Sequence, residues 1–405
     1  MRRSGFGDRP AGVEEDYMRP WTRIVSIAAV GMLVVACTTG GGGASPSAST
    51  AAPSVAAPSG DASVAPSASG GTSSAACNPP RQEGVTLTFV SFGGAYQEAQ
   101  RKAWLEPYTA LTGVQFQEDE GSSNATIKSQ VEAGQVTWDV VDVGNDFGLE
   151  ANAALLEELD YSIIPLDEVN KDLGPSKWRV PDITYGVVLA YNTEKTAGQV
   201  PAGWADYFDT TKFPGKRGMW DYSEGGIFEV ALMADGVAPK DLYTTGPGGV
   251  GLDLDRAITK LDTIKDDFVW WSSGAQSQEL IGSGEVAMTL IWNGRGWSAK
   301  HTDGKPVEMQ WNEQIVTADY FVVPKGSPNK DAAMTFIAYT ICAENNAKPS
   351  DYIPYGPTNI NAKPAEDKLA DLSVSNVNNA AYFDDEWLVN NFDTINAAYK
   401  EWRTR

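Results

Sequence analysis

Apolar residues in the first part of the folded region alternate between strand-like and helix-like spacing. The β-rich run at residues 85–90 is typical of a strand, and apolar residues at helical spacing follow it up to residue 111. The next predicted elements are a strand, a helix and a strand, at residues 114–116, 124–133 and 138–143. We also expect Asp146 to cap a helix that begins near residue 147. Strands that alternate with helices in this way predict an α/β fold with a mostly parallel sheet.

A second alternating series predicts another lobe of the same class. Its elements are a long apolar strand at 185–192, a strand at 218–220, helices at 227–234, 253–265 and 276–283, and a strand at 285–292. A strand at 319–324 and a helix at 330–343 then indicate a return to the first lobe. The roughly 320 residues that follow residue 84 exceed a comfortable single core. We therefore predict a first lobe at 85–184, a second lobe at 185–315, and a return to the first lobe with C-terminal helices at 316–405.

The N-terminal region predicts an exported protein. Basic residues at 19–23 precede the apolar run 24–36, which ends in small residues before Cys37, as in a secretory signal. As a helix this run would rise only about 20 Å, short of a bilayer core of about 30 Å. The cysteine at the cleavage position resembles a bacterial lipobox, so we predict removal of residues 1–36 and acylation of Cys37. An ordinary signal that is cut elsewhere is the alternative, and Met18 is an alternative start.

The segment after Cys37 predicts a tether. Residues 38–76 contain almost only Gly, Ala, Ser, Pro, Thr and Val, a composition that buries too little apolar surface to fold. We expect residues 37–84 to act as a flexible linker between a lipid anchor and the folded lobes. The formal net charge of −22 argues against nucleic acid as a partner and against a face that lies on anionic lipid.

The chain has three cysteines. If Cys37 is acylated, Cys77 and Cys342 remain as a possible disulfide pair in an oxidising compartment. Two unrelated free thiols are the alternative.

Several short motifs carry a resemblance to a known family. Their order along the chain is Phe-Gly-Gly-Ala-Tyr-Gln (92–97), Trp-Asp-Val-Val-Asp-Val (138–143), Ala-Tyr-Asn-Thr-Glu-Lys (190–195), Phe-Pro-Gly-Lys-Arg-Gly (213–218), Gly-Glu-Val-Ala-Met (284–288), Trp-Asn-Gly-Arg (292–295) and Val-Pro-Lys-Gly-Ser (323–327). This set resembles the polyamine-type solute-binding proteins of ABC importers. The resemblance implies two hinged α/β lobes of the periplasmic-binding-protein type that close on a small solute and dock on a membrane permease.

The resemblance also implies a set of ligand-binding positions in the cleft between the lobes. Family positions at the ends of strands and at the returning strand fall on Phe92, Tyr96, Gly144, Trp292, Asp319 and Tyr355. Residues 144–146 follow a predicted parallel strand, where ligands bind in such sheets, which adds Asn145 and Asp146. Asp319 is the expected partner of a ligand ammonium group, and the aromatic residues are expected to contact its methylene chain.

Two departures from the family pattern change the expected ligand. Putrescine receptors carry an amine-binding Asp three residues after the cleft Trp, and this chain has Arg295 there. The acidic residue expected before helix 227–234 is displaced to Glu224. Arg favours a carboxylate and disfavours an ammonium group in a cleft of low dielectric constant. We therefore predict a ligand with an amine at one end and a carboxylate at the other, such as an amino-acid-like or opine-like compound. The alternative is that Arg295 points to solvent or pairs with a carboxylate such as Glu224.

Nothing in the sequence indicates an enzyme. The chain has one histidine, no Gly-x-Ser-x-Gly elbow and no metal-ligand spacing, so we expect no cofactor and no metal. The predicted protein is a monomeric solute receptor, lipid-anchored on the outer face of the cytoplasmic membrane, that delivers its ligand to an ABC permease. The alternatives are a true polyamine receptor, a sugar receptor and a tethered sensor module.

Overall fold

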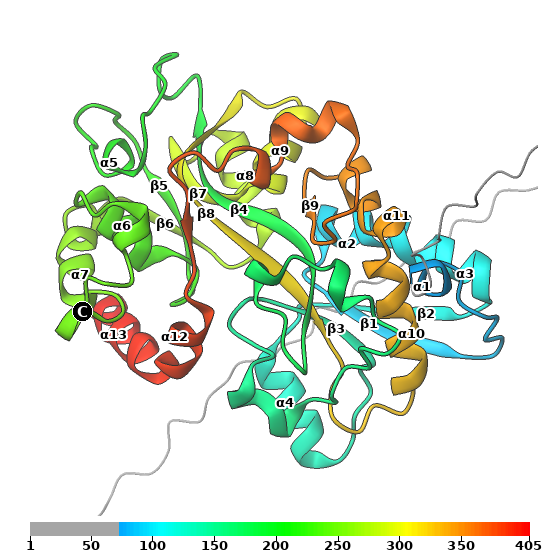
Figure 1. Ribbon diagram of the computed structural model, residues 1–405. Coiled ribbons are helices and arrows are strands. Elements are labelled where there is room, and N and C mark those ends of the chain that lie inside the picture. Colours follow the sequence, from blue (N-terminus) through cyan, green and yellow to red (C-terminus); the bar gives the residue numbers. More distant parts are fainter. Residues whose placement is uncertain (1–72) are drawn as a thin grey trace, which may run out of the picture. The chain divides into compact units, whose positions relative to one another are not determined.

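Figure 1 shows the computed structural model, which describes residues 73–405 of the chain. Its strands form one mixed sheet in the order β2-β1-β3-β8-β4-β7-β5-β6. The two long strands in the middle, β4 (Val180–Asn192) and β8 (Val307–Val322), run antiparallel to each other. Strand β3 pairs with the end of β8 and strand β7 with the end of β4, so the two long strands connect both halves of the sheet. The predicted signal, Cys37 and most of the tether lie outside the described residues.

The first half of the sheet is parallel, as predicted. Its strands are β1 (Thr86–Ser91), β2 (Gln115–Glu120) and β3 (Val140–Val143), and β1 pairs with both of the others. The helices of this half are α1 (Ser73–Cys77), α2 (Gly94–Gln100), a π-helical turn (Arg101–Leu105), α3 (Glu106–Thr112), α4 (Asn124–Ala133), α10 (Lys330–Ile341) and α11 (Ala343–Asn346). The rings of Phe89, Phe321 and Phe336 pack together between the sheet and α10, which buries the apolar face of each element.

The second half repeats the arrangement. Its strands are β5 (Arg217–Trp220), β6 (Phe268–Trp271) and β7 (Met288–Trp292), and β5 pairs in parallel with both neighbours. Its helices are α5 (Trp204–Tyr207), α6 (Ile227–Ala234), α7 (Leu254–Asp262), α8 (Gly274–Ser283) and α9 (Asn293–His301). The C-terminal helices α12 (Asp385–Asn390) and α13 (Phe392–Thr404) follow, and α13 lies beside α7 (Figure 1). Two short strands pair with the long ones, β9 (Gly356–Pro357) with β4 and β10 (Ala381–Tyr382) with β8.

The structure corrects three local predictions. Asp146 caps no helix, because a 3-10 turn begins only at Glu150 and Asp146 accepts hydrogen bonds from Asn124, at the start of α4, and from Tyr222. Strand β6 was not predicted, and strand β8 begins at Val307, so Asp319 lies near its end and does not open it. Arg295, which follows the predicted strand 285–292, lies in the first turn of α9.

Two further features concern the N-terminal part. Cys77 and Cys342 form a disulfide that joins α1 to the end of α10. Within residues 73–405, no helix is both long and apolar enough to cross a membrane.

Candidate functional site

One cavity, with a volume of about 520 Å³, lies between the two halves of the sheet. All of the predicted ligand-binding residues line it: Phe92, Tyr96, Gly144, Asn145, Asp146, Glu224, Trp292, Arg295, Asp319 and Tyr355. They come from the carboxyl ends of β1, β3 and β7, from the first turns of α2 and α9, from β8 and from the loops before α6 and β9. The order of the strands therefore brings residues that are far apart in the sequence to one site, although ligand binding by each stays a prediction.

Arg295 is a buried cation at this cavity. Its side chain is 2% exposed, its Nη2 donates a hydrogen bond of 2.9 Å to the carbonyl oxygen of Gly93, and its Nε has no partner among the described residues. No ion pair of the described part of the chain includes it, and burial lowers its pKa. The guanidinium therefore neither points to solvent nor pairs with Glu224.

Two glycines make room for the guanidinium. A Cβ atom would come within 2.8 Å of Arg295 Nη1 at Gly94 and within 2.5 Å of Arg295 Nε at Gly274. Gly94 also has a φ of 58°, in the left-handed region that favours glycine. Gly94, just after β1, therefore leaves space for the side chain of Arg295, which comes from the other half of the sheet.

Three buried carboxyl groups stand near the cavity without a basic partner. Asp319 lines it and is 5% exposed, whereas Asp142 and Asp182 are fully buried behind it. Tyr96 donates its hydroxyl to Asp182 at 3.1 Å, and Asp142 accepts from Gln100 at 2.6 Å and from Ser91 at 3.1 Å. No salt bridge of the described residues includes any of the three. A cation placed beside Asp319 would therefore meet unneutralised negative charge.

Burial and mutual repulsion shift the acidity of these groups. Burial is the main cause that raises the pKa of Asp142, to about 7. The pKa of Asp319 lies well above its usual range, because of burial and then the charges of Asp142 and Asp182, although a hydrogen bond from Tyr185 partly offsets the rise. Burial also raises the pKa of Glu224, at the other side of the cavity, to about 7.

These shifts predict how the stability of the ligand-free protein depends on pH. A carboxyl group whose pKa is raised from about 4 in the unfolded chain to about 7 binds a proton more tightly when folded. Its contribution to stability is complete below about pH 4 and is lost as the pH rises through 7. We expect the melting temperature of the ligand-free protein to fall between pH 5 and pH 8. Calorimetric melts would contradict this if the temperature stayed constant or rose, and Asp142→Asn should flatten the profile.

A cluster of aromatic rings forms an apolar wall of the cavity. Trp220 and Trp271 are parallel with ring centroids 5.6 Å apart, and Trp292 meets them edge-on at 5.1 and 5.6 Å. Phe92 also lines the cavity, with its ring centroid 6.5 Å from that of Trp292. Such a wall favours a methylene chain, or an ammonium group that lies over the face of a ring.

Several residues that line this cavity were missed by sequence reasoning, among them the aromatic residues Tyr185, Trp220 and Tyr222. Trp220 ends the parallel strand β5, so the rule that pointed to residues 144–146 would also have found it. Tyr222 donates a hydrogen bond of 2.6 Å to Asp146 Oδ2 from the other half of the sheet. Tyr185 lies in the middle of the buried strand β4, and no local signal distinguishes it from a core residue.

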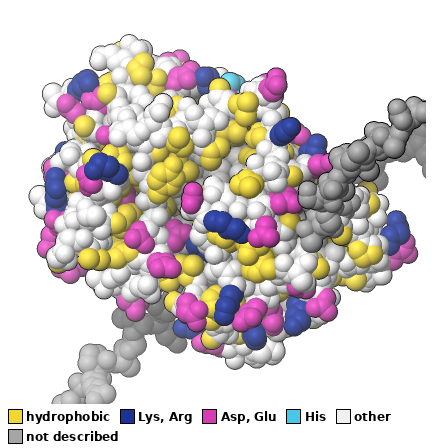
Figure 2. All heavy atoms as spheres, viewed as in Figure 1, with side chains coloured by type: hydrophobic (Ala, Val, Ile, Leu, Met, Phe, Trp, Pro, Cys, Tyr) yellow, Lys and Arg dark blue, Asp and Glu magenta, His cyan; other side chains and the backbone are white. Residues whose placement is uncertain are grey.

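Charge on the surface agrees with a small-molecule site. Acidic and basic side chains are interspersed on the face that Figure 2 shows, without a broad basic field. Among residues 73–405, no group of three or more His, Cys, Asp or Glu side chains has an arrangement that could hold a metal ion.

Comparison with known proteins gives a family. Residues 103–374 match the model of the bacterial extracellular solute-binding proteins. The γ-aminobutyric acid (GABA)-binding protein of Pseudomonas aeruginosa is 33% identical over 331 residues, which cover 79% of this chain and 91% of that protein. The solved structure of a GABA receptor is 38% identical with a TM-score of 0.71 over 79% of this chain and 98% of that one. A periplasmic binding protein of Agrobacterium tumefaciens R10 in complex with agropinic acid is 31% identical, with a TM-score of 0.72 over 80% and 100%.

The predicted resemblance to polyamine-binding proteins is confirmed only at a greater distance. A spermidine/putrescine-binding protein of Haemophilus influenzae is 27% identical over 276 residues, 64% of this chain. These similarities confirm the predicted two-lobed periplasmic-binding-protein fold. The chain belongs to the family of bacterial extracellular solute-binding proteins, and it is a binding component of an ABC transporter and not an enzyme.

Proposed function

We propose that this protein captures a small solute that carries an ammonium group and a carboxylate, and that it delivers the solute to its ABC importer. One observation carries the proposal: the guanidinium of Arg295 and the carboxyl group of Asp319 are both buried at the same cavity, and neither has an ionic partner among the described residues. Buried charges are costly unless they are paired, so a zwitterionic ligand would neutralise both ends of the site at once.

The roles of the other residues follow from this assignment. The ligand carboxylate binds the planar guanidinium of Arg295, and the ammonium group lies by Asp319, with Asp142 and Asp182 as further negative charge behind it. Phe92, Trp292 and Trp220 pack on the methylene chain between the two ends. The GABA-binding relatives and the agropinic acid complex support a ligand of this kind. A volume of about 520 Å³ also accommodates solutes longer than GABA, including opine-like conjugates.

The polyamine reading is the weaker one. A diamine would place its second ammonium group against Arg295, and a mispaired buried charge of this kind costs several kcal/mol. The sequence similarity to polyamine-binding proteins is also lower than that to GABA-binding ones.

Calorimetric titration with a panel of ligands tests the proposal. We expect GABA or a longer zwitterionic ω-amino acid to bind with a micromolar or lower Kd, and putrescine and spermidine to bind at least about 100-fold more weakly. Tight binding of a plain diamine would contradict the proposal and would indicate that the protein is a polyamine receptor. An opine-like conjugate in the panel shows whether the ligand extends beyond the amino-acid core.

We propose in addition that acylated Cys37 anchors the mature protein, as a monomer, to the outer face of the cytoplasmic membrane, and that residues 37–72 tether the two lobes to this anchor. The predicted tether extended to residue 84, but α1 and the Cys77–Cys342 disulfide belong to the folded part of the chain. Fatty-acid labelling of the cells, with Cys37→Ser as the control, tests the anchor.

A further inference from the structure

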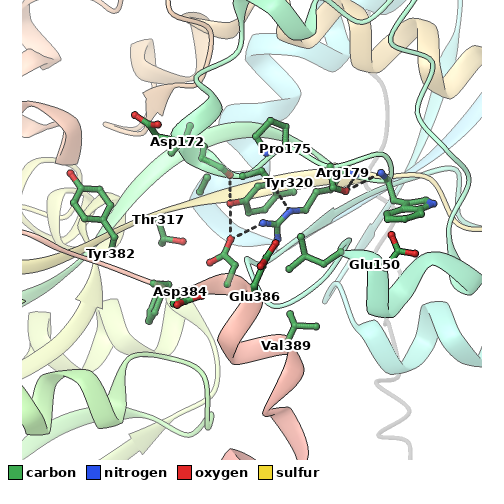
Figure 3. A pocket seen from close by; sticks show the side chains of 18 of the residues that line it. Glu150, Asp172, Pro175, Arg179, Thr317, Tyr320, Tyr382, Asp384, Glu386 and Val389 are labelled. Atoms are coloured by element: carbon green, nitrogen blue, oxygen red, sulfur yellow. Dashed lines mark hydrogen bonds and ion pairs between the residues drawn. The ribbon is translucent and has the colours of Figure 1, made fainter. Parts of the chain in front are cut away.

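Asn145 lies between two cavities. Its side chain lines the ligand cavity and is 7% exposed. A second, larger cavity of about 840 Å³ lies on the other side of the loop and is lined by Arg179, Tyr320 and the start of α12 (Figure 3). Phe383 lines both cavities. Asn145 reaches into this second group of residues, because its Nδ2 donates a hydrogen bond of 2.9 Å to Asp385 Oδ1.

Asp385 is held in a fixed orientation by two other residues. Its Oδ2 forms an ion pair of 2.7 Å with Arg179 Nη2 and accepts a hydrogen bond of 3.2 Å from the Tyr320 hydroxyl. Arg179 is 1% exposed, and the central carbon of its guanidinium lies 3.8 Å from the centre of the Tyr320 ring. Figure 3 shows the two side chains next to each other. Since Oδ2 is occupied by these partners, Oδ1 is the oxygen that faces Asn145.

The same arginine holds the backbone of the loop. Arg179 Nη1 donates to the carbonyl oxygens of Asn145 at 2.7 Å and of Phe147 at 3.0 Å. The backbone and the side chain of Asn145 are therefore both fixed from the side of the second cavity. This arrangement leaves the amide group of Asn145 no freedom to rotate toward another partner.

The chemistry of a carboxylate determines which atom of Asn145 the ligand meets. A carboxylate only accepts hydrogen bonds, so the amide must turn its NH2 group toward Asp385. The amide oxygen Oδ1 is then left on the other side, and no described residue donates to it. We propose that Asp385 is a positioning residue for ligand recognition, which presents the oxygen of Asn145 to the cavity as an additional acceptor for the ligand's ammonium group. The proposal rests on the proposed function.

The substitution Asp385→Asn tests this orientation. An amide at position 385 can donate as well as accept, so the Asn145 amide would be free to turn its NH2 group toward the ligand. The probes are GABA and γ-hydroxybutyrate, whose hydroxyl group donates and accepts and therefore tolerates both orientations. We expect the affinity for GABA, divided by the affinity for γ-hydroxybutyrate, to fall about tenfold in this variant, as measured by competition. A tenfold change is the effect of about one hydrogen bond to a charged group.

Glu386→Gln is the matched control. Glu386 is the next residue of α12, it is exposed, and its substitution removes the same charge while the bond between Asn145 and Asp385 stays in place. We expect this variant to keep the affinity ratio of the unaltered protein. A ratio that falls equally in both variants would mean that only the charge of α12 matters and would overturn the proposal.

A second variant covers the case in which Asp385→Asn unfolds after the loss of its pair with Arg179. Asn145→Ala leaves the pair of Arg179 and Asp385 intact and should lower the affinity ratio by a similar factor. The double variant should lower it no further than Asn145→Ala alone, because both changes remove one interaction. Additive losses, or an unchanged ratio in Asn145→Ala, would overturn the proposal. If the unaltered protein bound neither these probes nor any other zwitterionic ligand of the calorimetric panel, the proposed function itself would be wrong, and this inference with it.

Discussion

Exchanging Arg295 for methionine is expected to weaken the binding of a zwitterionic ligand such as GABA by at least about 30-fold. The guanidinium is buried and has no ionic partner among the described residues, so the ligand carboxylate would be its only one. Removal of one member of a buried, hydrogen-bonded charge pair costs about 2–5 kcal/mol or more, which corresponds to a loss of roughly 30-fold to several thousand-fold. Calorimetric titration measures the change.

The folded state should not suffer from this substitution. Burial lowers the pKa of Arg295, which means that the charge is held in the ligand-free protein at a cost. An apolar side chain of similar length removes that cost, although it loses the hydrogen bond to Gly93. We expect an unchanged or higher melting temperature, which would show that the loss of affinity comes from recognition. Arg256→Met is the control, because Arg256 is an exposed arginine that pairs with Asp235.

Arg295→Asp extends the test to specificity. With a carboxylate at this position, both ends of the cavity would favour ammonium groups, and putrescine should then bind more tightly than GABA. If neither the methionine nor the aspartate variant changed any affinity, the assignment of Arg295 to the ligand carboxylate would be wrong.

The cavity-lining residues were predictable where a parallel strand ends. Asn145 follows β3 and Phe92 follows β1, and a parallel sheet brings such positions to the same edge. Trp292 and Arg295 were found through the resemblance to a family, because no local pattern indicates that β7 lies beside β4 in the sheet. The same resemblance implied that an Arg stands where putrescine receptors carry an Asp, and this difference determines the expected ligand.

The partners behind the cavity could not be predicted. Asp142 stands in an apolar run and signals a buried charge, but its proximity to Asp182 depends on the order β3-β8-β4, which is set by non-local pairing. Asp385 meets Asn145 across 240 positions of the chain. Such contacts join segments that have no periodic relation to one another, so hydrophobic patterning does not contain them.

Exchanging Asp319 for asparagine is expected to change affinity and stability in opposite directions. The affinity for GABA should fall about 100-fold, because the ammonium group loses its nearest carboxylate in a buried site. The ligand-free protein should become more stable at pH 8, because the substitution removes one of three buried charges that repel each other. This gain should shrink at pH 5, where the raised pKa values leave the carboxyl groups largely protonated. Titration and thermal melts at both pH values measure the two effects.

Asp142→Asn separates the two effects, because Asp142 belongs to the same group of charges but does not line the cavity. It should stabilise the ligand-free protein at pH 8 as well, while the affinity for GABA falls by less than about tenfold. Equal losses of affinity in both variants would mean that the ammonium group senses the total charge of the group and makes no direct contact with Asp319. A loss of stability in Asp319→Asn at pH 8 would mean that the carboxylates stabilise the fold. Affinity and stability are expected to change in opposite directions because buried carboxyl groups without a basic partner destabilise the ligand-free protein. The ammonium group of the ligand supplies that partner when it binds.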